Sequence, residues 1–206
     1  FNGEKITTKK KEATMYKVPF KVDLSKKVIA ITGAGGIICG EFARALAACG
    51  AKVALLDINY EAAKKVADEI GENAFAVKCN CLDKEDIKAA KAAVNEKFGA
   101  VNYLTCDNEY MYPETTGVKD FFALDESGLK FVFDLNITSA FLVTQVFTAD
   151  MVKTGGNIVN ISSMNAYRPL TKIPAYSAAK AGVSNFTEWL AVHFAPCNIR
   201  CNAIAP

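Results

Sequence analysis

A doubly wound α/β fold with a parallel sheet is the fold class that this sequence predicts, and two observations carry the prediction. First, six short runs are apolar at nearly every position, as expected for strands that helices cover on both faces. Second, amphipathic stretches of helical length separate these runs, so that strand and helix alternate along the chain. The expected strands are Val28–Ile31, Val53–Leu56, Ala74–Val77, Val101–Thr105, Asn157–Ile161 and Ile199–Ile204.

The expected helices lie between these strands and carry recognisable signals at their ends. They are Glu41–Cys49, Tyr60–Ile70, Lys84–Phe98, a long one around Asp125–Val152, and Ala175–Ala195. Gly50 and Gly71 follow the first two, where helices commonly end in a left-handed residue. Asn59 and Asp83 are suited to N-caps. Residues 107–120 form a polar loop beyond the fourth strand, and ligands of such sheets bind outside the carboxyl ends of the strands, so we expect this loop to border the site.

One domain is expected over residues 28–206, preceded by a polar N-terminal lead-in at residues 1–27. The chain has 206 residues, 51% of them hydrophobic, which is enough for a sizeable core. Its 24 basic and 22 acidic residues are mixed along the sequence and give no electrostatic footprint for nucleic acid or an anionic membrane. No run approaches the roughly 20 apolar residues of a membrane helix, and no secretory signal opens the chain. We therefore expect a cytoplasmic protein that acts on a small molecule, without a nucleic-acid or membrane partner.

The cysteines are better explained as buried thiols than as metal ligands. There are seven of them and one histidine. The odd count, the lack of a Cys-x-x-Cys motif and the single histidine argue against a zinc site. We predict no metal and free thiols in a reducing compartment. The positions are Cys39, Cys49, Cys79, Cys81, Cys106, Cys197 and Cys201.

A glycine-rich turn, Thr32–Gly40, follows the first strand and predicts a dinucleotide site. Glycines let the backbone approach a pyrophosphate, and the helix that follows offers unpaired amides. Asp57 ends the second strand, where a carboxylate accepts hydrogen bonds from ribose hydroxyls and repels a 2′-phosphate. The alternative interpretation is that the glycines only make a tight turn and that Asp57 caps the next helix. We predict NAD, held here by Gly33, Gly35, Gly36, Ile37, Ile38 and Asp57.

A second motif predicts acid/base chemistry. Tyr176 and Lys180 are four residues apart in a predicted helix and therefore share one face. A nearby ammonium favours the phenolate and lowers the tyrosine pKa from its free value of about 10. Ser163, just after the fifth strand, is able to hydrogen-bond the same substrate oxygen. Together with the glycine turn, these residues predict an oxidoreductase in which Tyr176 is the acid/base group.

These residues together resemble the short-chain dehydrogenase/reductase family, from about Val18 to Pro206. The motifs are Thr32-Gly33, Asp57, Asn136 within Asp134-Leu135-Asn136, Ser163, Tyr176 with Lys180, and the closing segment Asn202–Pro206. The resemblance implies a Rossmann fold, a homo-oligomer (dimer or tetramer), and cofactor contacts from Asn80 and Cys81. It also implies that Tyr176 exchanges the proton, Ser163 orients the carbonyl, and Lys180 binds the nicotinamide ribose. Asn136 would hold a water of the proton relay.

Four departures from the family's pattern bear on the site. Ile37 and Cys39 take the places of the second and third glycines of the turn, and Asn80 takes the place of an acid. Cys106-Asp107-Asn108 stands where Asn-Ala-Gly is expected. The chain also stops at Pro206, before the family's usual last strand and substrate-covering segment, so we expect the domain to be C-terminally incomplete. A non-catalytic, nucleotide-binding member of the family is the alternative that these departures favour.

The segment Ser163–Tyr176 carries the prediction of substrate class. It and the turn Thr32–Gly40 resemble the D-mannonate oxidoreductase (fructuronate reductase) branch, which implies a sugar acid such as D-fructuronate or D-mannonate. We expect Asn165, Arg168 and Lys172 to meet this substrate, because a guanidinium fork matches a carboxylate. Solvated loop charges explain Arg168 and Lys172 equally well. A reductase of a lipid-like ketone is also left open, since fold alone does not set the substrate.

Overall fold

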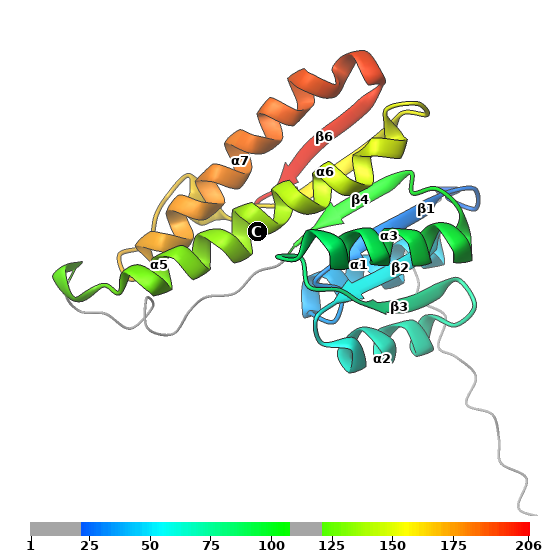
Figure 1. Ribbon diagram of the computed structural model, residues 1–206, viewed down its shortest axis with the longest axis horizontal. Coiled ribbons are helices and arrows are strands. Elements are labelled where there is room, and N and C mark those ends of the chain that lie inside the picture. Colours follow the sequence, from blue (N-terminus) through cyan, green and yellow to red (C-terminus); the bar gives the residue numbers. More distant parts are fainter. Residues whose placement is uncertain (1–21, 108–120) are drawn as a thin grey trace, which may run out of the picture.

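The computed structural model describes residues 22–107 and 121–206, and it has the predicted fold: one domain built on a parallel sheet with helices on both faces (Figure 1). The sheet has six strands in the order β3-β2-β1-β4-β5-β6, and each neighbouring pair is parallel. The strands are β1 (Val28–Thr32), β2 (Lys52–Asp57), β3 (Ala74–Lys78), β4 (Tyr103–Cys106), β5 (Gly156–Ile161) and β6 (Ile199–Ile204). The strand order reverses between β1 and β4, which is where sheets of this class bind ligands.

The helices connect successive strands and agree with the predicted positions to within a few residues. They are α1 (Ile37–Ala48), α2 (Tyr60–Ile70), α3 (Lys84–Phe98), α5 (Glu126–Phe133), α6 (Ser139–Met151) and α7 (Pro174–Phe194). Short 3-10 turns lie at Phe121–Ala123, Met164–Ala166 and Ala195–Cys197. Asn59 and Asp83 accept hydrogen bonds from first-turn amides and cap α2 and α3, as predicted.

The core has two layers because strand side chains alternate between the faces of the sheet. In β1, Ile29 and Ile31 pack with α1 and α2, whereas Val28 and Ala30 pack on the opposite face with α3 and α6. Both faces are buried, which explains why the strand sequence is apolar without alternation.

Two predicted helices differ from the structure. The helix expected at Glu41–Cys49 begins earlier, at Ile37, because Gly36 in an extended conformation opens it directly after the turn. The helix expected around Asp125–Val152 is interrupted by a π-helical turn, η2 (Asp134–Thr138). An extra residue inserted into a helical turn re-aims nearby side chains, and such turns are frequent at functional sites.

The helical run Glu126–Met151 is also long and apolar enough, by length and composition alone, to cross a membrane, which differs from the expectation that no segment approaches this limit. Half of its most apolar window is buried inside the protein. The apolar residues of α6, among them Val143, Phe147 and Met151, belong to the core beneath the sheet. Core packing therefore accounts for the buried half of this apolar window.

Candidate active site

The predicted site residues lie along the edge of the sheet where the parallel strands end, and the proposed catalytic residues gather beside three neighbouring strands. β1 ends at Thr32, β4 at Cys106 and β5 at Ile161, and these strands are adjacent in the sheet. Parallel strands all present their carboxyl ends to one edge, so segments far apart in sequence meet there. The glycine turn enters from β1, Ser163 follows β5, and α7 carries Tyr176 and Lys180 past the same edge.

The glycine turn is shaped by close backbone approach. Gly33 has φ of +60°, a conformation that side chains disfavour. Gly35 lies against α2, where an added Cβ would come within 2.7 Å of Ala62 Cβ and 3.0 Å of Asp57 Oδ2. Gly36 is the N-cap of α1 and makes no side-chain capping bond. The first-turn amides of α1, at Ile37 and Ile38, therefore face a turn without a side-chain cap, an arrangement that suits a phosphate.

Asp57 ties the second strand to this turn. Its Oδ2 accepts a 2.8 Å hydrogen bond from the amide of Gly35, and its Oδ1 accepts one of 2.8 Å from the amide of Asn59. The cap of α2 is Asn59 and not Asp57, so the alternative in which Asp57 merely caps that helix is wrong. A carboxylate oxygen can accept more than one hydrogen bond, and the half-buried group remains able to meet ribose hydroxyls.

Asn80 and Cys81 follow β3 on the same side of the sheet. The side-chain oxygen of Asn80 accepts a 3.0 Å hydrogen bond from the backbone amide of Leu82. The backbone N–H of Asn80 donates a 2.7 Å hydrogen bond to Asp86 Oδ2. The side chain of Cys81 is buried. Local bonds thus hold this turn in place, and the adenine contact expected here stays a prediction.

Tyr176 and Lys180 lie one helical turn apart on α7, as their spacing predicts. Both side chains are buried, and the Lys180 ammonium lies 5.6 Å from the centroid of the Tyr176 ring. Lys180 Nζ also donates a 2.8 Å hydrogen bond to the carbonyl of Ile161 at the end of β5. The cation is thereby fixed between the sheet and the phenol.

Ser163 and Asn165 lie in the turn that follows β5. Ser163 Oγ accepts a 3.2 Å hydrogen bond from the amide of Asn165, and both side chains are buried. The Asn165 Oδ1 atom has no hydrogen-bond partner among the described residues. The amide of Met164 donates 2.9 Å to the carbonyl of Pro206, which fixes this turn to the end of the chain segment after β6.

Asn136 occupies the middle of the π-helical turn. Its side-chain nitrogen donates a 2.9 Å hydrogen bond to the carbonyl of Val132, one turn earlier. Its Oδ1 atom is buried and, within the part of the chain that the structure describes, is without a partner. A buried carbonyl oxygen of this kind needs a partner such as an ordered water.

Arg168 and Lys172 are exposed, in contrast to Asn165. The amide of Arg168 donates a 2.9 Å hydrogen bond to the carbonyl of Met164, the first residue of the 3-10 turn. Neither side chain forms an ion pair within residues 22–107 and 121–206. The structure thus brings Asn165 next to Ser163 and leaves the two cations at the surface.

Sequence reasoning did not assign a role to Asp107 and Cys39, which the structure places beside Lys180. The Asp107 carboxylate lies 3.8 Å from Lys180 Nζ, and the Cys39 thiol contacts its other oxygen at 3.8 Å. Burial raises the pKa of the Cys39 thiol, and the Asp107 charge raises it further. The departure from Asn-Ala-Gly at this strand end was the available signal. Asn108 and the rest of the loop 107–120 after Asp107 lie outside the described residues.

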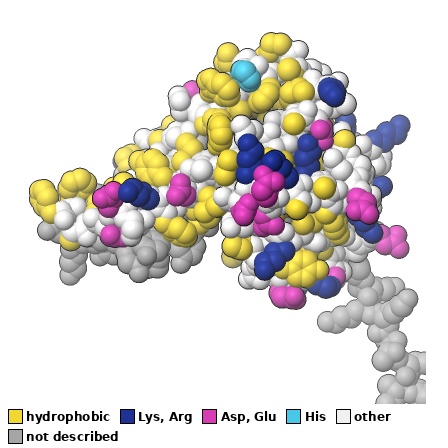
Figure 2. Space-filling view, viewed as in Figure 1, with side chains coloured by type: hydrophobic (Ala, Val, Ile, Leu, Met, Phe, Trp, Pro, Cys, Tyr) yellow, Lys and Arg dark blue, Asp and Glu magenta, His cyan; other side chains and the backbone are white. Residues whose placement is uncertain are grey.

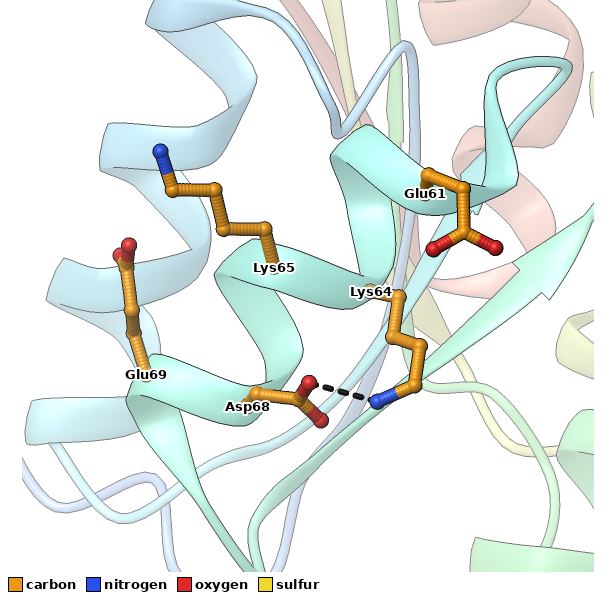
Figure 3. A pocket seen from close by; sticks show the side chains of 5 residues that line it. All are labelled: Glu61, Lys64, Lys65, Asp68 and Glu69. Carbon is orange, nitrogen blue, oxygen red and sulfur yellow. Dashed lines mark hydrogen bonds and ion pairs between the residues drawn. The ribbon is translucent and has the colours of Figure 1, made fainter.

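Neither the surface hollow on α2 nor the cysteines offer a second site. Figure 3 shows the hollow lined by charges of both signs, with Lys64 paired to Asp68 one turn away. This pair is exposed and belongs to an ordinary solvated helix face. All seven cysteines are free thiols, five of them buried. Among the described residues no three His, Cys, Asp or Glu side chains are grouped as a metal site would require.

Comparison with known proteins agrees with this geometry. The short chain dehydrogenase family matches residues 27–206. An uncharacterized oxidoreductase of Haemophilus influenzae is 50% identical over 200 residues, which cover 89% of this chain and 70% of that protein. The uncharacterized oxidoreductase UxuB of Bacillus subtilis is 42% identical, covering 92% of this chain and 73% of its own length. A crystal structure of a Haemophilus influenzae protein, named as a candidate D-mannonate oxidoreductase with bound NAD, superposes with a TM-score of 0.86 at 48% identity, covering 89% of this chain and 71% of that one. This chain therefore belongs to the short-chain dehydrogenase family.

Proposed function

We propose that this short-chain dehydrogenase is an NAD-dependent oxidoreductase that interconverts a carbonyl and an alcohol on a sugar acid, such as D-fructuronate and D-mannonate. The observation that carries the proposal is the cluster of Ser163, Tyr176 and Lys180 at the strand edge where the glycine turn also ends. NAD, when bound, supplies or accepts the hydride of such a reaction. The chain's own residues bind, orient and exchange the proton.

The glycine turn and Asp57 fit a dinucleotide. Gly33 and Gly36 leave no side chain between the backbone and a pyrophosphate, and Gly35 lets the turn pack against α2, where an added Cβ would clash. The amides of Ile37 and Ile38 would hold the phosphates at the positive end of α1. Asp57 would bind the adenosine ribose, Asn80 and Cys81 the adenine, and Lys180 with Tyr176 the nicotinamide ribose.

Tyr176 is the proposed proton donor and acceptor. The Lys180 ammonium is buried and held beside the phenol, and a cation in a site of low dielectric acts more strongly than one in water. Ser163 would donate a hydrogen bond to the substrate oxygen and stabilise the charge that develops on it. These three groups are sufficient to orient a carbonyl and protonate it.

Asn136 would supply the path by which the proton reaches solvent. Its buried Oδ1 lacks a partner among the described residues, and a water bound there would complete its hydrogen bonding. The π-helical turn places this residue facing inward rather than along the helix surface. We propose that this water belongs to the proton relay that serves Tyr176 and Lys180.

The substrate assignment rests on the turn after Ser163. The buried Oδ1 of Asn165, two residues from Ser163, would accept a hydrogen bond from a sugar hydroxyl. Arg168 and Lys172 follow in the same exposed segment and would supply the cations that a carboxylate requires. The similarity to the candidate D-mannonate oxidoreductase supports the same class of substrate.

A substrate panel with purified protein tests the proposal. We expect NADH oxidation with D-fructuronate and related hexuronates, and little with uncharged keto-sugars or with lipid-like and steroid ketones. Turnover of the lipid-like ketones alone would replace the substrate class and keep the chemistry. Binding of NADH without turnover of any ketone would identify a non-catalytic member.

We also propose that the protein forms a homo-oligomer through the outer face of α6 and α7. Figure 2 shows hydrophobic side chains gathered around the single histidine, His193. There Phe186, Trp189 and His193 form a continuous aromatic stack, and the Trp189 side chain is 54% exposed. Exposed aromatic clusters are typical of contact surfaces between proteins. Light scattering should show a dimer or tetramer that Trp189→Lys weakens.

A further inference from the structure

Asp107 lies beside Lys180 and has no assigned role in the proposed mechanism. Its backbone is fixed at the end of β4 by the fully buried Thr32 hydroxyl. That hydroxyl accepts a 3.0 Å hydrogen bond from the Asp107 amide and donates one of 3.3 Å to the Asp107 carbonyl. These two bonds hold the residue at the edge of the sheet, so the position of its carboxylate is set by the fold rather than by a free loop.

The carboxylate lies between α1 and α7. One oxygen is 3.8 Å from Lys180 Nζ, and the other accepts a weak hydrogen bond of 3.8 Å from the Cys39 thiol. The side chains of Lys180 and Asp107 are only 2% and 10% exposed. Charges act on each other more strongly at such depth than at the surface, because water screens them less.

The Lys180 ammonium therefore contacts at least three groups. It donates to the Ile161 carbonyl at 2.8 Å, forms the ion pair with Asp107, and lies over the Tyr176 ring. A cation near a phenol favours the phenolate, whereas a carboxylate close to that cation offsets the effect.

The titratable groups described on the surrounding elements are paired with each other, exposed or neutral. Glu126 and Lys130 of α5 pair with each other at the surface, and Asp134 of the π-helical turn is exposed. Arg168 and Lys172, in the segment that leads into α7, are exposed. Three buried thiols stay neutral because burial raises their pKa: Cys39, Cys106 and Cys201. Neither β5 nor the 3-10 turn Met164–Ala166 carries a titratable side chain. Among the described residues, Asp107 is the carboxylate paired with Lys180.

We propose that Asp107 is a positioning residue that takes part of the Lys180 charge away from Tyr176 and thereby keeps Tyr176 protonated to a higher pH. The inference rests on the proposed role of Tyr176. A protonated phenol is the form that gives its proton to an oxygen when a carbonyl is reduced, and the phenolate is the form that removes one from an alcohol. Asp107 therefore widens the pH range over which the protein works as a reductase.

The ionisation of Tyr176 can be measured directly in the protein without cofactor or substrate. Tyrosinate absorbs in the near ultraviolet, and subtracting the titration of Tyr176→Phe isolates this phenol from the seven tyrosines of the chain. The same subtraction is made in an Asp107→Asn background, which keeps the shape and removes the charge. We expect the midpoint to fall by about one pH unit or more, the size expected of one neighbouring charge.

Asp134→Asn is the matched control, because it removes an exposed carboxylate from the nearby π-helical turn and should leave the midpoint unchanged. Asp107→Ser serves if Asp107→Asn does not fold. The upper pH limit of NADH-dependent reduction should fall by the same number of pH units. A folded Asp107 variant with an unchanged or higher midpoint would overturn the proposal. A subtraction that shows no titration of Tyr176 at all would count against the proposed function itself.

Discussion

The ammonium of Lys180 in α7 donates a 2.8 Å hydrogen bond to the carbonyl of Ile161, the last residue of β5. This bond joins a side chain of the helix to the carboxyl end of the sheet, and Lys180 is only 1% exposed. The distance between the cation and the Tyr176 ring is consequently fixed by the packing of α7 against β5 and β6, and not by a flexible surface contact. A buried cation with a defined partner is the kind of group that tunes a neighbouring acid.

Removing the hydroxyl of Tyr176 should stop the reaction and leave cofactor binding nearly intact. The ring packs with Val132, Ile173, Ala175 and Ala179, and Tyr176→Phe keeps these contacts. A placed proton donor typically contributes a factor of ~10²–10⁴, so kcat should fall at least that far while the Kd for NADH changes little. Tyr167→Phe is the control, since that ring is 72% exposed. A Tyr176→Phe protein with near-native turnover would remove Tyr176 from the mechanism.

Gly35→Ala should cost both stability and cofactor affinity. Its Cβ would lie 2.7 Å from Ala62 Cβ, so the turn or α2 must shift. Strain of this kind costs roughly 1–3 kcal/mol, which denaturant unfolding would detect, and the displaced turn should weaken NADH by tenfold or more. Gly99→Ala is the matched control. Its Cβ would meet nothing within 4 Å although φ is +91°, so we expect lost stability with unchanged NADH affinity.

Asp57→Asn should reduce the preference for NADH over NADPH. The amide keeps one acceptor oxygen for the amide of Gly35 or Asn59, and it removes the charge that repels a 2′-phosphate. We expect the ratio of the two dissociation constants, measured by isothermal titration, to move toward NADPH by about tenfold. Asp57→Ala should weaken NADH further, since it also releases the turn. A native protein that already prefers NADPH would contradict the NAD assignment.

The strands could be predicted because their physical cause is local. Each is buried on both faces, so Ile29 and Ile31 on one side and Val28 and Ala30 on the other give an unbroken apolar run. The start of α1 was not predictable in the same way. Its first residue, Ile37, is 88% exposed, so an apolar residue stands where periodicity expects a polar one.

The π-helical turn has no local sequence signal, and it lies in close tertiary contact with α7. Gly182 of α7 faces Ile137 in that turn, and a Cβ at Gly182 would lie 2.7 Å from Ile137 Cδ1. The two segments are 45 residues apart in the sequence, so neither segment alone shows this contact. The resemblance to the family could place Asn136, but not its orientation.

The site residues also fall into two groups, those that local sequence predicts and those that only tertiary contacts bring together. Tyr176, Lys180 and Ser163 were predictable because one helical turn and one strand end bring them together. Asp107 and Cys39 were not, because their contact with Lys180 joins three segments: the first turn of α1, the end of β4 and the middle of α7. Only the strand order, with β4 beside β1 and β5, creates that meeting.

The last prediction concerns the carboxylate of the proposed substrate. Arg168 is exposed, its amide is bonded to the carbonyl of Met164, and Pro169 after it disfavours a helical conformation. Its planar fork is therefore free of helical packing and able to form two parallel hydrogen bonds with a carboxylate, which lysine cannot reproduce. Arg168→Lys keeps the charge and removes the fork.

We expect this variant to raise KM for D-fructuronate by about tenfold or more with little change in kcat, in line with ~1.5–3 kcal/mol for a charged hydrogen bond. KM for an uncharged keto-sugar, measured in parallel, should stay the same, because that substrate has no carboxylate to lose. Lys153→Arg, at an exposed lysine in the turn after α6, controls for the general effect of exchanging surface cations. An unchanged KM for the uronate would return Arg168 to the solvated surface, and recognition of the carboxylate would then have to come from other groups.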